Sequence, residues 1–203
     1  MSWGQDFHVK AQPSTLSGAA YGHTYARSAI AVAMADHQAT PFYGVDPAEM
    51  NSHTSAGGAP VFFYKMGDRF ERPEYRQSPW VMGSIGDWTS LGPDSGLSPF
   101  YGTSAAAPNV AAVAALVLEA ASDYKKMTQD QLKAILKNSA NDTDDTLIGG
   151  FDIGYDIATG YGFLDAHRAV YLASIGDTGE GTCDSGLVKK KKKKGGKKGK
   201  KKK

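Results

Sequence analysis

Apolar residues along the chain gather in a few short runs, which are separated by stretches rich in Gly and Pro. Residues 28–34 form one run that includes the β-branched Ile30 and Val32. This run predicts a strand buried on both faces, as in a parallel sheet, although a buried helical turn has the same pattern. Residues 61–64 predict a second strand. Residues 67–99 carry Pro or Gly every few positions, which predicts mostly loop.

The strongest helix signal begins at Pro108 or just before it. Residues 109–122 contain neither Gly nor Pro for fourteen positions and are apolar nearly all round. A helix of this kind has no face suited to water, so we expect it to lie in the middle of the domain.

Two further helices are predicted from their capping residues. Thr128 and Gln131 have the spacing of a capping box, and Leu132, Ile135 and Leu136 then form one apolar stripe. A third helix is expected to begin after Asp165 as N-cap and to end before Gly176. Strands that alternate with helices favour a layered α/β fold.

Composition divides the chain into an acidic body and a basic end. The 203 residues are 41% hydrophobic and suffice for one globular domain. The net charge of +2 conceals residues 189–203, which are 12 lysines and three glycines. Without those lysines, 11 of the 23 basic residues remain against 21 acidic ones, a net charge of −10. The single cysteine, Cys183, excludes an intrachain disulfide, so the fold must depend on core packing.

The lysine tail is expected to bind nucleic acid, anionic lipid or other acidic surfaces without sequence preference. A disordered solubilising end explains the same composition equally well. We found no run of about 18 apolar residues, so no transmembrane segment is expected. The first residues lack the basic start and apolar stretch of a secretory signal, and localisation stays open.

The sharpest chemical feature is the segment 102–111, Gly-Thr-Ser-Ala-Ala-Ala-Pro-Asn-Val-Ala, which places Ser104 directly before the apolar helix. Free backbone N–H groups and the positive end of the helix dipole face the place where an oxyanion would form. Three alanines after Ser104 are expected to leave room for a substrate backbone, and Pro108 is expected in the first helical turn, which does not use its N–H. The alternative is that Thr103 or Ser104 only caps a core helix.

The longer pattern of residues 102–116 resembles the nucleophile signature of the subtilisin-like serine peptidases, the subtilases of peptidase family S8. Further landmarks of that family extend over roughly residues 20–172. They are residues 22–23, 29–32, 40–41, 55–58, 76–77 and 159–166.

This resemblance implies a subtilisin-like three-layer α/β fold with a mostly parallel sheet, represented by its C-terminal portion. It also implies a serine endopeptidase in which Ser104 attacks the scissile carbonyl of a polypeptide substrate. In the family the Asp, the His and the oxyanion Asn all precede the landmarks matched here. We therefore expect an irregular segment over residues 1–19, a partial peptidase domain over 20–175 and a disordered tail over 176–203. No signal predicts a cofactor.

The missing triad partners are not found elsewhere in the sequence. Three segments have the letters Asp-x-Gly, beginning at Asp94, Asp177 and Asp184, but their positions suit turns. Of the five histidines, His23 belongs to the landmark before the predicted strand and the other four are expected to be surface or loop residues; three asparagines are expected to be turn or helix-end residues. These are His8, His23, His37, His53 and His167, with Asn51, Asn138 and Asn141.

No metal site is predicted either. Asp142, Asp144 and Asp145 form an acidic cluster that calcium could occupy in principle, although a solvated loop is the favoured interpretation. The sequence therefore predicts a subtilisin-like endopeptidase fragment without its Asp and His. The alternative is an inactive remnant or binding module with a nonspecific polybasic anchor.

Overall fold

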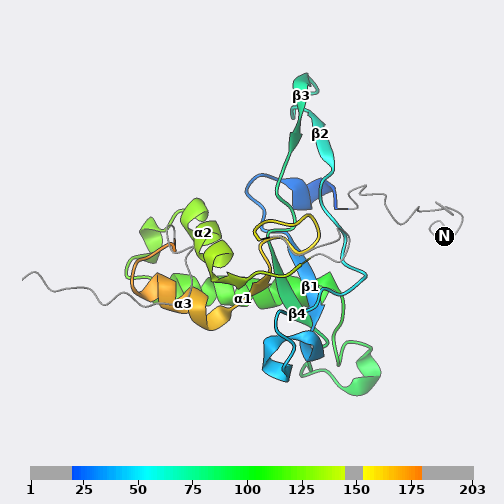
Figure 1. Ribbon diagram of the computed structural model, residues 1–203, viewed down its shortest axis with the longest axis vertical. Helices are drawn as coiled ribbons and strands as arrows, with labels where there is room; N and C mark the ends of the chain where they lie inside the picture. Colours follow the sequence, from blue (N-terminus) through cyan, green and yellow to red (C-terminus); the bar gives the residue numbers. More distant parts are fainter. Residues whose placement is uncertain (1–19, 145–152, 180–203) are drawn as a thin grey trace, which may run out of the picture.

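A four-stranded, mostly parallel sheet forms the centre of the protein (Figure 1). The computed structural model describes residues 20–144 and 153–179. The strand order is β1-β4-β6-β5, in which β1 is parallel to β4, β4 is parallel to β6, and β5 is antiparallel to β6. The strands are β1 Val32–Asp36, β4 Val81–Ile85, β5 Ala140–Asn141 and β6 Phe163–Leu164. The α/β class with a mostly parallel sheet is therefore confirmed.

The first predicted strand is confirmed, with its bounds shifted toward the C-terminus. It was expected over residues 28–34 and begins at Val32. Its three central residues are buried, as the two-sided pattern predicts. Val32 to Asp36 pair in register with Val81 to Ile85.

Residues 67–99 lie mostly outside regular elements, as expected, but the two strands within them were not predicted. This stretch contains β3 (Arg69–Tyr75) and the whole of β4, the strand between β1 and β6. The β4 sequence includes Gly83 and Ser84, which are weak strand formers. Gly83 is needed because α1 crosses there: a Cβ atom on it would lie 2.7 Å from the carbonyl oxygen of Ala106. Close packing against a neighbour, and not local propensity, explains this strand.

The three α-helices are α1 Thr103–Ala120, α2 Gln129–Ser139 and α3 Ala166–Ser174. Both predicted caps are confirmed: Thr128 and Gln131 form the capping box, and the Asp165 carboxylate accepts from Arg168 N–H (2.9 Å). Helix α1 instead begins five residues before Pro108, so the expected start at Pro108 is wrong. Pro108 lies inside the helix, where the N–H that would donate to the Ser104 carbonyl is missing.

Helix α1 is not surrounded by protein on all sides in the part of the chain that the structure describes. Val110 and Val117 are buried in the core with residues of α2, α3 and β4, whereas the Leu116 side chain is 49% exposed. The expectation of a helix without an exposed face is therefore wrong here, because the described sheet and helices cover α1 on one side. By length and composition α1 could also cross a membrane, but a core helix passes the same test, and α1 packs on β1 and β4.

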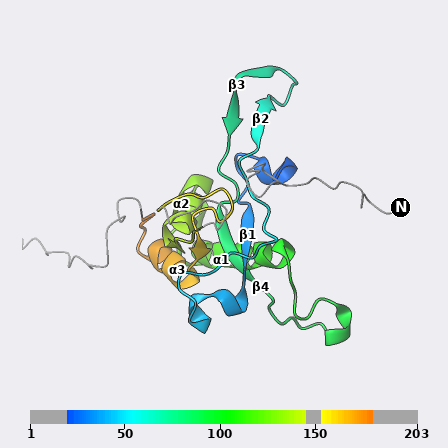
Figure 2. The same ribbon diagram turned by 45° about the vertical axis from the view of Figure 1, so that its right-hand side comes forward.

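Strands β2 (Pro60–Phe63) and β3 form an antiparallel hairpin that projects from the body, as both views show (Figures 1 and 2). The strand predicted at residues 61–64 is thus present, one residue earlier. Short 3-10 helices connect the other elements. They are η1 Gly22–Tyr25, η2 His37–Ala39, η3 Pro41–Tyr43, η4 Pro93–Ser95 and η5 Tyr124–Lys126.

Candidate active site around Ser104

Ser104 is the second residue of α1 and is exposed. The helix is preceded by Gly102, whose φ of +90° favours a residue without a side chain. Gly102 is the N-cap and has no side chain to hydrogen-bond the helix. The interpretation of Thr103 or Ser104 as the cap is therefore wrong, and the Ser104 hydroxyl makes no hydrogen bond within the described residues.

Backbone donors gather at the same end of α1. The N–H groups of Ala105 and Ala106 both donate to the Gly102 carbonyl, at 2.8 and 3.3 Å. Those of Thr103 and Ser104 precede the first intrahelical hydrogen bonds and lie at the open end of the helix. Together with the helix dipole they favour negative charge near Ser104.

The alanines after Ser104 have a different role from the one expected. Ala105 and Ala106 are buried and pack with Met34 of β1 and Ile85 of β4, and only Ala107 is exposed. The expected room for a substrate backbone is thus wrong for two of the three positions. Their small size allows the first turn of α1 to lie close against the sheet, which places Ser104 at the edge of a rigid layer.

A polar network that the sequence analysis did not identify holds the second turn of α1. The Asn109 amide donates from Nδ2 to Asp87 Oδ2 (2.7 Å) and to the Ser84 carbonyl (3.1 Å). The Ser84 hydroxyl donates to Asp87 Oδ2 (3.1 Å). This network ties the helix to the end of β4. Asn109 stands in the recognised motif, but its partners are 22 and 25 residues away, and no local signal reveals them.

No described histidine hydrogen-bonds Ser104. His23, His53 and His167 are exposed, and His37 is half-buried in η2. The Nδ1 atom of His37 lies 3.2 Å from the Ile85 carbonyl oxygen, and its ring contacts Tyr43 edge-on. His8 lies outside the described residues.

The Asp-x-Gly segments form turns where the structure describes them. Asp94 lies in η4, followed by Gly96 at φ +70°, and Asp177 Oδ1 accepts from Gly179 N–H (2.8 Å). Asp184 lies outside the described residues. Neither of the described aspartates is hydrogen-bonded to a histidine.

The three asparagines are also accounted for. Asn51 forms a turn through His53 N–H, as expected, and Asn138 lies at the end of α2 and donates to the Thr178 carbonyl (2.8 Å). Asn141 lies in β5, so the expectation of a turn or helix end is wrong for it.

A cavity of about 210 Å³ opens beside the start of α1. Its walls come from η1, β1 and the segment before β4, with Thr103 at one side. A second cavity, of about 340 Å³, shares Thr24 and Ser78 with it. The two cavities therefore adjoin each other at these two residues.

Within residues 20–144 and 153–179, no three His, Cys, Asp or Glu side chains lie close enough together to hold a metal ion. Asp142 Oδ2 accepts from Gly154 N–H (3.0 Å), which gives it a place in the fold. Asp145, Cys183 and the lysine tail lie outside the described residues.

The subtilase family profile matches residues 19–162, more than half of the chain. A comparison with curated proteins found no match. Among solved structures, the chain is similar to one titled "Crystal Structure of a Lanthipeptide Protease", with 21% identity and a TM-score of 0.36. That likeness covers 71% of this chain and 51% of the other, so the chain spans about half the length of that protein. The profile match over more than half of the chain is decisive: the chain belongs to the subtilase family.

Proposed function

We propose that this chain is part of a serine endopeptidase of the subtilisin type and that Ser104 is its nucleophile. The observation that carries the proposal is the exposed Ser104 at the open end of α1, inside the region that matches the subtilase family. In the proposed reaction Ser104 Oγ attacks the scissile carbonyl and its proton passes to a base. The same proton then goes to the leaving amine, and water hydrolyses the acyl-enzyme.

We also propose that this chain lacks the Asp and the His of the catalytic triad. The support for this is that no described histidine hydrogen-bonds Ser104 and that the described Asp-x-Gly segments are turns. Without its base, a serine nucleophile loses most of its rate, and binding and an oxyanion hole supply the remainder. We further propose residues 20–175 as the peptidase portion, and a tail over 176–203 that contacts anionic surfaces nonspecifically.

A fluorophosphonate probe tests the nucleophile. The chain alone is expected to remain unlabelled. A fusion in which a subtilase segment with Asp-Thr-Gly and His-Gly-Thr motifs precedes residue 20 is expected to be labelled. Ser104→Ala should abolish that labelling, whereas Ser95→Ala, in an exposed turn, should leave it intact. Labelling that survives Ser104→Ala, or a folded fusion that remains unlabelled, contradicts the assignment of Ser104.

Labelling of the chain alone at Ser104 would show that the base is present in it, and would contradict the proposed absence of the triad partners. The second candidate function is a binding module without hydrolysis. The observation that favours it is that the Ser104 hydroxyl makes no hydrogen bond to a base within the described residues. A folded fusion that binds polypeptides and resists the probe would support this candidate.

A further inference from the structure

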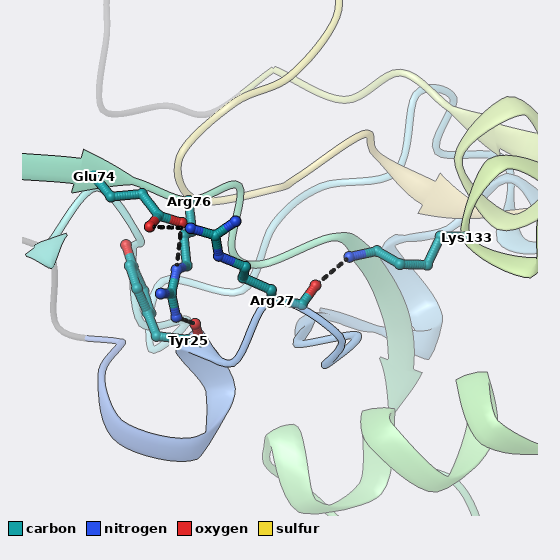
Figure 3. Close-up of polar contacts among 5 residues, drawn as sticks. All are labelled: Tyr25, Arg27, Glu74, Arg76 and Lys133. Carbon is teal, nitrogen blue, oxygen red and sulfur yellow. Dashed lines mark hydrogen bonds and ion pairs between the residues drawn. The ribbon is translucent and has the colours of Figure 1, made fainter. Parts of the chain in front are cut away.

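The larger of these two adjacent cavities is lined by more positive than negative side chains. It lies between η1, the end of β3 and α2, and Figure 3 shows the side chains that meet there. Two arginines and one lysine line it, Arg27, Arg76 and Lys133, against a single carboxylate, Glu74. The four come from positions as far as 106 residues apart in the sequence.

Glu74 is shared between the two arginines. Arg27 donates to its Oε2 (2.7 Å) and Arg76 donates from Nε to its Oε1 (2.8 Å). Arg76 also donates to the carbonyl of Tyr25. The Arg76 guanidinium, through its hydrogen bond above all, lowers the pKa of Glu74, so the carboxylate stays ionised. One negative charge therefore faces two guanidinium groups.

Lys133 has no carboxylate partner among the described residues. Its ammonium donates to two neutral acceptors, the carbonyls of Arg27 (3.3 Å) and Ala29 (3.4 Å). It also lies 4.0 Å from the ring centroid of Trp80. Partial burial lowers the pKa of Lys133, and Asp130 on the same helix opposes this shift through space without forming an ion pair. A partly desolvated cation that forms no ion pair within the described residues is stabilised by an anion that enters the cavity.

Donors for such an anion are free to turn toward it. Arg27 uses one nitrogen on Glu74, its side chain is 72% exposed, and its planar fork suits a carboxylate. The neighbouring cavity indicates that the occupant is part of a polypeptide. Thr24 and Ser78 line both cavities, and the smaller cavity reaches Thr103 beside Ser104. A chain of phosphates fits poorly, since Glu74 lines the site and the body without the tail carries a net charge of −10.

We propose that this cavity binds the carboxylate of an acidic residue in a polypeptide, held by Arg27 and Lys133. The inference deepens the proposed function, on which it rests for the occupant being a polypeptide. The substrate feature that this chain recognises is then an acidic residue, which lies next to the part of the polypeptide that is bound at Ser104.

Binding is measured without any need for hydrolysis, by calorimetry on the full chain with acetylated, amidated peptides. The pair is Gly-Ser-Tyr-Glu-Ser-Gly and its twin with Gln in place of Glu. The Glu peptide is expected to bind at least about tenfold more tightly, as one charge-assisted contact provides. Acetate should compete with it.

Lys133→Met keeps the aliphatic stem over Trp80 and removes the charge, so the preference for Glu should fall to within about twofold. Lys137→Met is the matched control, one turn further along α2: Lys137 lies 4.5 Å from the Tyr161 ring centroid and does not line the cavity. It should retain the preference, and this control also accounts for peptide bound to the lysine tail. Arg27→Gln, at an exposed position, should also reduce the preference for the Glu peptide. This second test does not depend on the folding of the Lys133 variant.

Equal binding of the Glu and Gln peptides overturns the inference, as does a preference that survives both Lys133→Met and Arg27→Gln. Oligothymidylate binding that falls in Lys133→Met but not in Lys137→Met, without acetate competition, would make the cavity a phosphate site and also overturn it. Failure here with Ser104 labelled in the fusion leaves the peptidase proposal standing. Glu-selective peptide binding in a fusion whose Ser104 is not labelled would support the carboxylate-binding cavity and contradict the peptidase proposal.

Discussion

Strand β2 is more apolar in sequence than strand β4, yet β2 is the more exposed of the two. The β2 sequence, Pro-Val-Phe-Phe, is strongly apolar, yet Phe62 and Phe63 are 38% and 54% exposed. The β4 sequence, Val-Met-Gly-Ser-Ile, includes two small residues, yet Val81 and Met82 are 0% exposed.

Neighbours explain the difference. Strand β4 has β1 on one side, β6 on the other and α1 across its face. Strand β2 pairs only with β3, in a hairpin that extends away from the body (Figure 2). Burial in this protein thus follows from the number of elements that meet at a strand.

The largest effect is expected for Met82→Ala in β4. It should lower the free energy of unfolding by about 2–5 kcal/mol, because it removes a fully buried side chain and leaves a cavity. Phe63→Ala in β2 is the matched change and should cost no more than about 1 kcal/mol. Urea unfolding of both variants measures this, and similar losses would contradict the comparison.

Gly83→Ala tests the close approach of α1 to β4. The added Cβ lies 2.7 Å from the Ala106 carbonyl oxygen, a backbone atom, so we expect a loss of about 1–3 kcal/mol. The control is Gly92→Ala, where a Cβ meets nothing within 4 Å and φ is −62°. That change should be neutral or stabilise the fold by a few tenths of a kcal/mol. If the two variants unfold at the same urea concentration, the contact is not tight.

Tyr155 contacts the segment before β4 and makes the stability of the fold depend on pH. The Ser78 N–H donates to Tyr155 Oη (2.7 Å), and burial raises the pKa of Tyr155 to about 12 from its ordinary value of 10.0. Between about pH 10 and pH 12 the Tyr155 hydroxyl therefore keeps its proton in the folded state and loses it in the unfolded state. The resulting stability is complete below about pH 10 and is lost as the pH rises toward 12.

Tyr155→Phe should cost about 1–2 kcal/mol at neutral pH, because it leaves the Ser78 N–H without its acceptor. The difference in stability between the wild type and this variant should then narrow between pH 10 and 12, since only the wild type has this group to ionise. Urea unfolding at pH 7, 9.5 and 11.5 measures it. A difference that stays constant would show that Tyr155 is not buried as described.

The smallest effect is expected at the cap of α2, far from β4. Thr128→Ala removes the hydroxyl that accepts from Gln131 N–H (3.2 Å) and should cost about 1 kcal/mol. Thr128→Ser keeps that hydroxyl and should cost much less. Thermal unfolding of the two variants distinguishes them, and equal melting temperatures would contradict a capping role.

Local signals were the reliable part of the sequence. The caps at Thr128 and Asp165 are contacts between residues three apart. Thr128 was predicted with its partner Gln131, and Asp165 was predicted as an N-cap. The motif around Ser104 likewise placed an exposed serine at the start of a helix. Its interpretation failed where it depended on distant elements: the buried Ala105 and Ala106 are small because β1 and β4 lie against them.

The sequence by itself determined the family, the position of Ser104, the start of α2 and both ends of α3, because each depends on residues that are neighbours in the chain. The tertiary structure alone decided that β4 is central, that Asn109 joins Asp87, and that Arg27, Glu74, Arg76 and Lys133 surround one cavity. Those contacts join residues as far as 106 positions apart. Distances of this kind are set by how strands and helices pack, which no local pattern of apolar and polar residues encodes.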